Sequence, residues 1–452
     1  MEGSEGVLSK RRVAVLGAGG RDFHNFNVLL RDNPSYEVVA FAVTQIPNIE
    51  NRVYPPELAG HRYPEGIPVV SVEKMYDLIK QGLVDEVWLS YSDITCEELA
   101  EVVSRVTLLG ANLVVPSPIK AMLKSQRPVI AVTASRTGAG KSTVSRYVAR
   151  ILRELGVRYV VVRHPMPYGD LRVSIVQRFA SYEDIDKYHC TLEEREEYEP
   201  HIAEGNVVYA GVDYERVLVE AERESQVIIW DGGNNDVPFY KPDLYITVVD
   251  PTRPKDVATS FPGVINVALA DVIVVNKVNL VPREYVDQTV SIARSVNRRA
   301  EIVEAESVLK VDAPELIRGK RVVVVEDAPT VTHGSLGRAA GYQAALEYGA
   351  AEIVDPRPYA VGSLREIYAK YPWLDRVVPS LGYGEHQMRD LEETLNLIDA
   401  DAIVLGTPAD LSRVLKLNKP VVRVTFELRE RSGRLREIIE KFVKGLLGKG
   451  GS

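Results

Sequence analysis

A run of small and basic residues in the middle of the chain has the composition of a phosphate-binding loop. The apolar segment 129–134 leads into Ser-Arg-Thr-Gly-Ala-Gly, and Lys-Ser-Thr follows at once before a helical stretch. Small residues let successive backbone N–H groups turn toward an anion, and the first turn of a helix adds partial positive charge. This order predicts a P-loop, although Ser stands where the pattern has its first Gly. The predicted nucleotide-binding residues are Ser135, Arg136, Thr137, Gly138, Ala139, Gly140, Lys141, Ser142 and Thr143.

Two further positions complete the expected nucleotide chemistry. In a P-loop the lysine reaches the β- and γ-phosphates and the following hydroxyl binds Mg²⁺, which here predicts those roles for Lys141 and Ser142. A second metal anchor is expected at the carboxyl end of a neighbouring strand, where the apolar run 227–230 ends in Asp231. We therefore predict a nucleoside triphosphate and Mg²⁺ as cofactors, Ser142 and Asp231 as metal ligands, and Lys141 and Asp231 as catalytic residues.

The segment that would contact the nucleotide base is ambiguous. Asn276-Lys-Val-Asn279 follows an apolar run at the place where GTPases carry Asn-Lys-x-Asp. The aspartate of that pattern accepts two N–H bonds from guanine, and the amide of Asn279 cannot offer two acceptors in the same way. We expect Asn276 and Lys277 to pack on a purine, and the choice between ATP and GTP stays open.

Three loops rich in arginine and histidine each follow a predicted strand, at 17–27, 163–170 and 326–338. The carboxyl ends of parallel strands form the functional edge of such sheets, so these loops are expected near one another. A single histidine is more often a solvated or core residue, but three such loops in an acidic chain favour a small polyanionic ligand. The candidate substrate-binding residues are Arg21, His24, Asn25, Arg163, His164, His333 and Arg338, of which Arg163 and His164 are also catalytic candidates.

The first of these loops also resembles the opening turn of a dinucleotide-binding fold. Its glycines lie at positions 17, 19 and 20, but the third fingerprint glycine is missing and no acidic partner is evident. Arginine, histidine and asparagine beside a helix start suit a phosphate or carboxylate better than a nicotinamide. A purely structural turn is the alternative.

Short apolar runs alternate with amphipathic stretches along the whole chain, which predicts parallel, doubly wound α/β sheets. We expect a Rossmann-like domain over 1–125, a P-loop domain over 126–319, and a C-terminal α/β region over 320–452 that folds alone or completes the second sheet. The predicted strands are 12–16, 37–42, 84–90, 113–115, 128–133, 159–163, 227–231, 244–249, 271–276, 321–325, 351–354, 402–405 and 420–424, with helices at 142–154 and 434–447.

The composition argues against several classes of protein. The 452 residues carry 55 Lys and Arg against 63 Asp and Glu, a net charge of −8 that argues against a nucleic-acid partner. Two cysteines cannot build a disulfide framework and fit a cytoplasmic protein, and no apolar stretch is long enough to span a membrane. The acidic run 193–199 predicts a solvated helix or lid segment. The sequence does not decide between a monomer and a homodimer.

The motifs together resemble a known family. Gly-Arg-Asp-Phe-His-Asn-Phe-Asn at 20–27, Arg-His-Pro-Met-Pro-Tyr-Gly-Asp at 163–170 and Val-Glu-Asp-Ala-Pro-Thr-Val-Thr-His-Gly at 325–334 accompany the P-loop. This combination resembles the archaeal cyclic 2,3-diphosphoglycerate synthetases and their relatives, often described only as predicted GTPases. The likeness covers almost the whole chain.

The resemblance implies an ATP-dependent synthetase that forms an intramolecular phosphoanhydride in 2,3-diphosphoglycerate and releases ADP and phosphate. It implies that the arginine- and histidine-rich loops hold the substrate phosphates, and relatives of the same architecture act on other phosphorylated metabolites. The alternatives are a regulatory or metallochaperone-like P-loop GTPase and, more distantly, a NAD-binding oxidoreductase.

Overall fold

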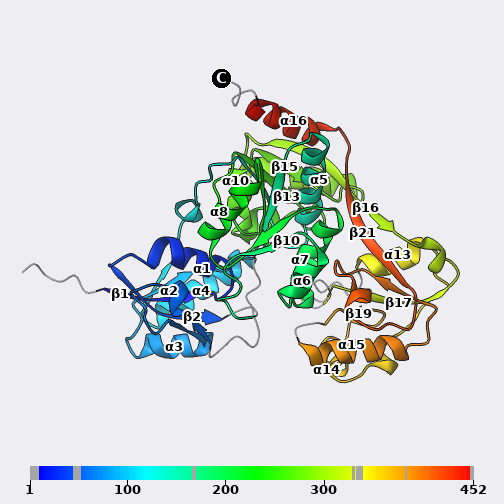
Figure 1. The fold of residues 1–452 in the computed structure, drawn as a ribbon, viewed down its shortest axis with the longest axis horizontal. Helices are drawn as coiled ribbons and strands as arrows, with labels where there is room; N and C mark the ends of the chain where they lie inside the picture. The colour runs from blue at the N-terminus through cyan, green and yellow to red at the C-terminus, as the bar shows by residue number, and fades with distance from the viewer. Residues whose placement is uncertain are drawn as a thin grey trace, which may run out of the picture. The chain divides into compact units, whose positions relative to one another are not determined.

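The computed structural model describes residues 10–43, 52–164, 169–327, 331, 339–381 and 384–447. The chain forms two compact units, and each unit is discontinuous in sequence (Figure 1). Unit 1 comprises residues 1–178, 208–305 and 430–452, and unit 2 comprises residues 179–207 and 306–429. The predicted boundaries at residues 126 and 320 therefore do not coincide with the limits of these units, because the segment 179–207 packs with residues more than a hundred positions further along the chain.

Unit 1 contains two large sheets and a two-stranded antiparallel sheet formed by β6 (Ile94–Thr95) and β14 (Ser260–Phe261). The first has the order β3-β4-β2-β1-β5-β7, and its pairs are parallel except for β3 with β4. Alternate residues of β1 enter hydrophobic clusters on opposite faces, so this sheet is covered on both sides. Its elements are β1 (Arg11–Leu16), α1 (Arg21–Asn25), β2 (Tyr36–Val43), β3 (Val53–Tyr54), α2 (Pro56–Ala59), β4 (Ile67–Ser71), α3 (Val72–Lys80), β5 (Glu86–Leu89), β6 (Ile94–Thr95), α4 (Cys96–Leu108) and β7 (Asn112–Val114).

The second sheet of unit 1 carries the glycine loop. Its strands run in the order β11-β9-β12-β8-β13-β15-β16, and neighbouring strands in this order pair in parallel. The chain leaves β8 at the centre of this sheet, between β12 and β13, where a parallel sheet places its ligand crevice. The elements are β8 (Val129–Ala134), α5 (Lys141–Glu154), β9 (Tyr159–Arg163), β10 (Gln177–Phe179), β11 (Val208–Ala210), α8 (Tyr214–Glu224), β12 (Val227–Asp231), β13 (Leu244–Val249), α9 (Asp256–Thr259), β14 (Ser260–Phe261), α10 (Gly263–Leu269), β15 (Val272–Val275), α11 (Arg283–Val296), β16 (Glu301–Val311) and α16 (Arg434–Leu447).

Unit 2 is a smaller parallel α/β body. Its strands run in the order β21-β20-β17-β18, and β19 also pairs with β17. The predicted parallel α/β architecture is therefore confirmed, while the Rossmann-like assignment of residues 1–125 stays a prediction. The elements of unit 2 are α6 (Tyr182–Lys187), α7 (Leu192–Ala203), β17 (Arg321–Glu326), α13 (Ala340–Glu347), β18 (Glu352–Ile353), α14 (Ser363–Lys370), β19 (Val378–Pro379), α15 (Glu385–Leu397), β20 (Ala402–Leu405) and β21 (Val421–Glu430).

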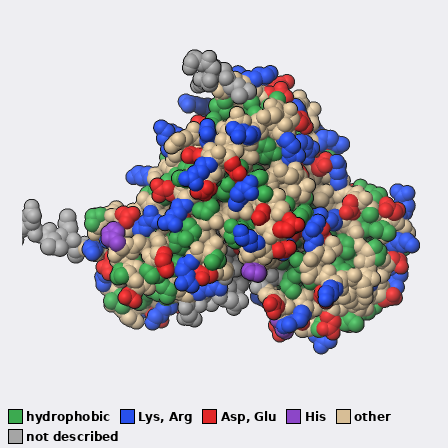
Figure 2. Space-filling view, in the orientation of Figure 1, with side chains coloured by type: hydrophobic (Ala, Val, Ile, Leu, Met, Phe, Trp, Pro, Cys, Tyr) green, Lys and Arg blue, Asp and Glu red, His purple; other side chains and the backbone are tan. Residues whose placement is uncertain are grey.

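Surface charge and helix hydrophobicity can be compared with the expectations from composition. On the face drawn in Figure 2, basic and acidic side chains are interspersed over both units rather than gathered into a patch of one sign. Among the described helices none is both long and apolar enough to cross a membrane.

The prediction of a solvated helix at 193–199 is wrong. These residues lie in α7, where Tyr198 and Glu199 are fully buried. Glu199 accepts hydrogen bonds from Arg195 at 3.0 Å and from the backbone N–H of Asp410 at 2.8 Å. Glu196 accepts one from the hydroxyl of Ser380 at 3.1 Å. Hydrogen-bond donors contributed by distant segments compensate the buried carboxylates, and charge along the sequence does not reveal those donors.

A buried carboxylate at the end of β17 organises the start of α13. Glu326 has no exposed surface and accepts hydrogen bonds from the backbone N–H groups of Ala339, Gly341 and Tyr342, at 3.1, 3.1 and 2.7 Å. A carboxylate at a helix start satisfies N–H groups that have no partner within the helix. Burial nevertheless dominates and raises the pKa of Glu326 to about 7.

This pKa predicts a pH-dependent stability. Because the folded-state pKa lies above that of an exposed glutamate, the stabilisation is present in mild acid and is lost as the pH rises through about 7. We expect Glu326→Gln to reduce the fall in thermal-unfolding midpoint of the wild type between pH 5 and pH 8, an effect on the order of 1–3 kcal/mol. The exposed Glu366→Gln in α14 is the matched control. An unchanged slope in Glu326→Gln would exclude this carboxyl as the source.

Candidate functional site

The glycine loop is held in shape by its own backbone and by one distant amide. Gly140 has a φ of +100° and lies immediately before Lys141, the first residue of α5. A Cβ atom on Gly140 would lie 2.1 Å from Nδ2 of Asn276. Both the left-handed backbone and this close approach require glycine at this position.

Beneath the loop, one carboxylate is paired with two cations. Asp231, at the end of β12, lies 2.7 Å through Oδ1 from Nζ of Lys141 and 2.7 Å through Oδ2 from a guanidinium nitrogen of Arg163. Asp231 is completely buried, and both cations are nearly so. Burial lowers the pKa of Lys141 to about 8, although Asp231 opposes the shift. The cluster thus keeps two positive groups directed to the place where a P-loop binds phosphates.

The two predicted metal ligands lie on either side of the same guanidinium. The Arg163 nitrogen that pairs with Asp231 donates a hydrogen bond to the hydroxyl of Ser142 at 3.2 Å. A hydroxyl and a carboxylate are hard oxygen donors of the kind that Mg²⁺ prefers. The residues therefore fit the metal, and Ser142 and Asp231 are the side chains that would hold it.

Asn276 and Lys277 contact the loop itself. Nδ2 of Asn276 donates to the carbonyl of Ala139 at 2.9 Å, and Nζ of Lys277 donates to the carbonyl of Gly138 at 2.7 Å. Nζ of Lys277 also lies 2.7 Å from Asp250; burial raises the pKa of this carboxyl, but the ammonium and the hydrogen bonds from Thr252 together hold it below its ordinary value. The structure therefore gives both residues a supporting role in the loop, and their contact with a base stays a prediction.

His164 connects the first sheet of unit 1 with the second. A Cβ atom on Gly20 would lie 1.8 Å from Nε2 of His164, and one on Gly233 would lie 2.8 Å from its Cγ, so the ring is placed between two glycines. Its Nε2 lies 3.4 Å from Oδ2 of Asp236, and 21 % of the side chain is exposed. Burial lowers the pKa of His164, so the ring is neutral near pH 7. A neutral imidazole beside a carboxylate has the chemistry of a proton acceptor.

Arg21 approaches the same aspartate from the glycine-rich loop of the first sheet. Its Nε pairs with Oδ1 of Asp236 at 3.1 Å, and another of its nitrogens donates to the carbonyl of Val237. The guanidinium lies over the ring of Phe239, 4.6 Å from the centroid. Arg21 and His164 thus meet at Asp236, although 143 positions separate them in the sequence.

Comparison with known proteins places the chain among relatives. No protein-family model matches it. Over 436 residues it is 56% identical to arginine synthetase ArcE of Thermococcus kodakarensis, a match that covers 96% of this chain and 97% of that protein. The chain belongs to the family of this arginine synthetase. A cyclic 2,3-diphosphoglycerate synthetase of Thermococcus sibiricus is 24% identical over 227 residues, which cover 46% of this chain and 52% of that relative.

The motif-based resemblance therefore holds for the wider family, while the relative with high identity is an arginine synthetase. The chain is a synthetase-type enzyme with a P-loop. Among solved structures, LpxK of Aquifex aeolicus in complex with ATP aligns with 82% of this chain and 94% of its own, at 13% identity and a TM-score of 0.44.

In this member of the arginine synthetase family, the remaining candidate residues do not all reach the site. The ring of His24 stacks on Phe239, and its Nε2 lies 2.7 Å from the carbonyl of Ala121. Burial lowers the pKa of His24 to about 3, so it is a neutral core residue. Asn25 is also buried and donates to the hydroxyl of Ser90 at 3.0 Å. His333 and Arg338 lie outside the described residues.

Two supporting residues of the loop were missed from the sequence. Asp93 accepts a hydrogen bond from the backbone N–H of Thr137 at 3.3 Å and lies 3.4 Å from Nε of Arg136. Asn235 accepts from the N–H of Asp93 at 2.8 Å and donates to the carbonyl of Ser135 at 3.1 Å. Their positions in the sequence could have indicated them, because Asp93 follows the carboxyl end of β5 and Asn235 follows that of β12.

The packing of His164 against Gly20 predicts a strong coupling between these positions. We expect Gly20→Ala to destabilise the protein by about 1–3 kcal/mol, because the new methyl group overlaps an imidazole held by Gly233 and Asp236. In a His164→Ala background the same substitution should cost less than about 0.5 kcal/mol. Denaturant unfolding of the four proteins measures this coupling, with Gly445→Ala as a control at a glycine that has open space around it. Equal costs in both backgrounds would contradict the contact.

The Asn-Lys-x-Asn segment makes a prediction about nucleotide choice. Asn279 is exposed and follows the two residues that contact the loop. We expect Asn279→Asp to raise kcat/KM for GTP relative to ATP by about tenfold, because a carboxylate restores two acceptors for guanine. Steady-state kinetics with both nucleotides measures the ratio. If the ratio does not move, the base is recognised elsewhere.

Proposed function

We propose that the chain is an ATP-dependent arginine synthetase. The observation that carries the proposal is the buried Lys141–Asp231–Arg163 cluster beneath the P-loop, in a chain 56% identical to an arginine synthetase over almost its whole length. The cluster contains the cations that phosphoryl transfer requires. The name of the relative indicates that the product is arginine.

The chemistry follows from the structure of the product. The guanidinium carbon of arginine bears three nitrogens, so a ureido precursor must lose its oxygen. The precursor oxygen attacks the γ-phosphorus, ADP leaves, a nitrogen nucleophile then adds to the carbon and loses a proton, and phosphate departs. Lys141 and Arg163 neutralise the transferring phosphoryl group by positioning and charge. His164, held by Asp236, is the candidate proton acceptor. Mg²⁺ bound through Ser142 and Asp231 would offset charge on the phosphates.

The charge arrangement favours this reaction over cyclisation of 2,3-diphosphoglycerate. Arg21 and Arg163 are among the candidates for binding substrate phosphates; Arg21 is paired with the buried Asp236, and Arg163, paired with Asp231, is assigned here to the nucleotide phosphates. A substrate carrying two phosphates needs several cations in addition to those that serve the nucleotide phosphates. The motif-based expectation of 2,3-diphosphoglycerate remains the second candidate, supported by the distant relative of that name.

The experiment uses the reverse reaction, because a catalyst accelerates both directions. L-arginine with ADP and phosphate should yield ATP, read by luciferase, and Lys141→Ala should lower the rate by about a hundredfold or more. Lys124→Ala, an exposed lysine of the same unit, is the control and should retain activity.

Two other results would lead to different assignments. ATP-dependent phosphate release that requires 2,3-diphosphoglycerate and not arginine would replace the proposal with the second candidate. Hydrolysis that responds to a protein partner but to neither metabolite would favour a nucleotide-dependent switch.

A further inference from the structure

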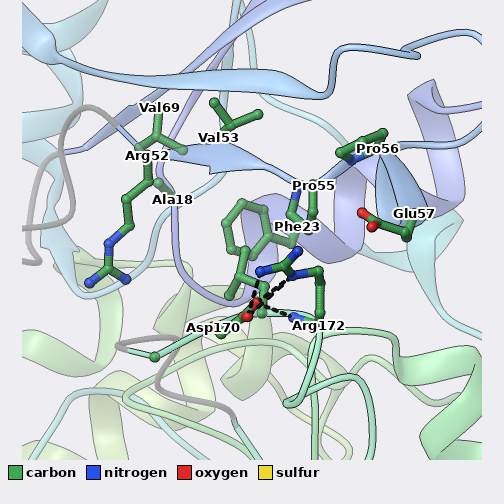
Figure 3. Close-up of a pocket in the computed structure, with 12 residues that line it drawn as sticks. Ala18, Phe23, Arg52, Val53, Pro55, Pro56, Glu57, Val69, Asp170 and Arg172 are labelled. Carbon is green, nitrogen blue, oxygen red and sulfur yellow. Dashed lines mark hydrogen bonds and ion pairs between the residues drawn. The ribbon is translucent and has the colours of Figure 1, made fainter.

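A cavity of about 720 Å³ opens in unit 1 beside the glycine-rich loop of the first sheet (Figure 3). This volume is within the range of small-molecule sites. Its walls come from three separate segments: the loop and start of α1, the β3–α2 region with β4, and residues 169–172. Nothing in the nucleotide chemistry described above uses it.

The cavity and the P-loop sheet share the glycine-rich loop as a wall. Ala18 and Phe23 line the cavity, while Gly20 between them packs against His164. The segment 169–172 that forms the opposite wall belongs to the connection that leaves β9 after His164. A molecule in the cavity would therefore contact the same loop that packs against His164.

The lining combines an apolar interior with charges of both signs. Phe23, Val69 and Pro55 supply apolar surface, and the charged residues are Arg52, Glu57, Asp170 and Arg172. In Figure 3 the paired Asp170 and Arg172 lie below the ring of Phe23, and Glu57 lies on the α2 side. Arg172 pairs with Asp170 at 2.8 Å, and Asp170 first and Glu57 to a lesser extent raise the pKa of Arg172.

Two basic and two acidic side chains leave the lining without net charge, which suits a zwitterion and not a polyanion. An apolar interior between them matches an aliphatic stem. We propose that this cavity binds the amino-acid substrate of the synthetase, a long-chain α-amino acid of the arginine type. Arg52 is on the wall where an α-carboxylate would bind, Glu57 on the wall for a cationic nitrogen, and the stem lies along Phe23 and Val69. This inference rests on the proposed function and adds the location of its second substrate.

The test measures binding of L-arginine by isothermal titration, separately from binding of a nonhydrolysable ATP analogue. Glu57→Gln removes one charge without changing shape and should weaken arginine binding about tenfold or more. Val53→Trp fills the cavity from an exposed position and should abolish binding at millimolar arginine. The matched controls Glu73→Gln and Val103→Trp lie on α3 and α4, outside the cavity lining, and should bind as the wild type does. Agmatine, which lacks the carboxylate, should bind the wild type more weakly than arginine.

The outcomes separate the two proposals. If the wild type binds arginine, and both cavity variants bind it equally well, the site lies elsewhere and this inference is overturned while the proposed function stands. If the wild type neither binds arginine nor forms ATP from it, the proposed function fails. Loss of ATP-analogue binding in a cavity variant indicates general damage, and Glu57→Gln, the milder change, then decides the question.

Discussion

One buried carboxylate sets the electrostatics beneath the glycine loop of unit 1. Asp231 is completely buried. Each of its two carboxylate oxygens lies 2.7 Å from a cation, one from Lys141 and the other from Arg163. Removing one partner from such a cluster leaves an uncompensated charge in the core, which typically costs 3–5 kcal/mol. The carboxylate is at the end of β12, the lysine opens α5 and the arginine ends β9. The relative placement of these three elements is therefore constrained by charge as well as by packing.

A second aspartate performs a similar task between the two sheets of unit 1. Asp236 lies 3.1 Å from Arg21 and 3.4 Å from His164, so a residue of the P-loop sheet receives one cation from the first sheet. Gly20 lets the glycine-rich loop approach the imidazole closely enough to complete this arrangement. The loop that resembles a dinucleotide fingerprint in sequence thus serves here as a contact surface. Gly20 is explained by the neighbouring His164, and Gly17 by its left-handed backbone and the close approach of Asp22.

Local pattern was sufficient for the strands and for the P-loop, but not for residues whose environment is made by distant segments. Strands β9, β12, β13 and β20 agree with the predicted bounds, because each is a continuous apolar run buried on both faces. Strand β16 was missed since its buried residues, Val303 and Ala305, alternate with half-buried glutamates. From its residue type and position, His24 was predicted to bind a substrate phosphate. In the structure Phe239, 215 positions away, stacks on its ring and holds it in the core. The acidic run in α7 was misjudged for the same reason.

Under the proposed function, the pairing of Asp231 would couple the binding of nucleotide and metal. A triphosphate that attracts Lys141 and Arg163 leaves Asp231 with an unbalanced charge in a site of low polarity, an unfavourable state. A divalent cation alone would have to approach two positive groups that already occupy both carboxylate oxygens. Binding of either ligand alone would therefore be unfavourable. With both bound, the two cations would pair with the phosphates and Asp231 would pair with the metal, so that all charges stay balanced. Arg163, which contacts Ser142 and Asp231 through one nitrogen, is the group whose movement would couple the two events.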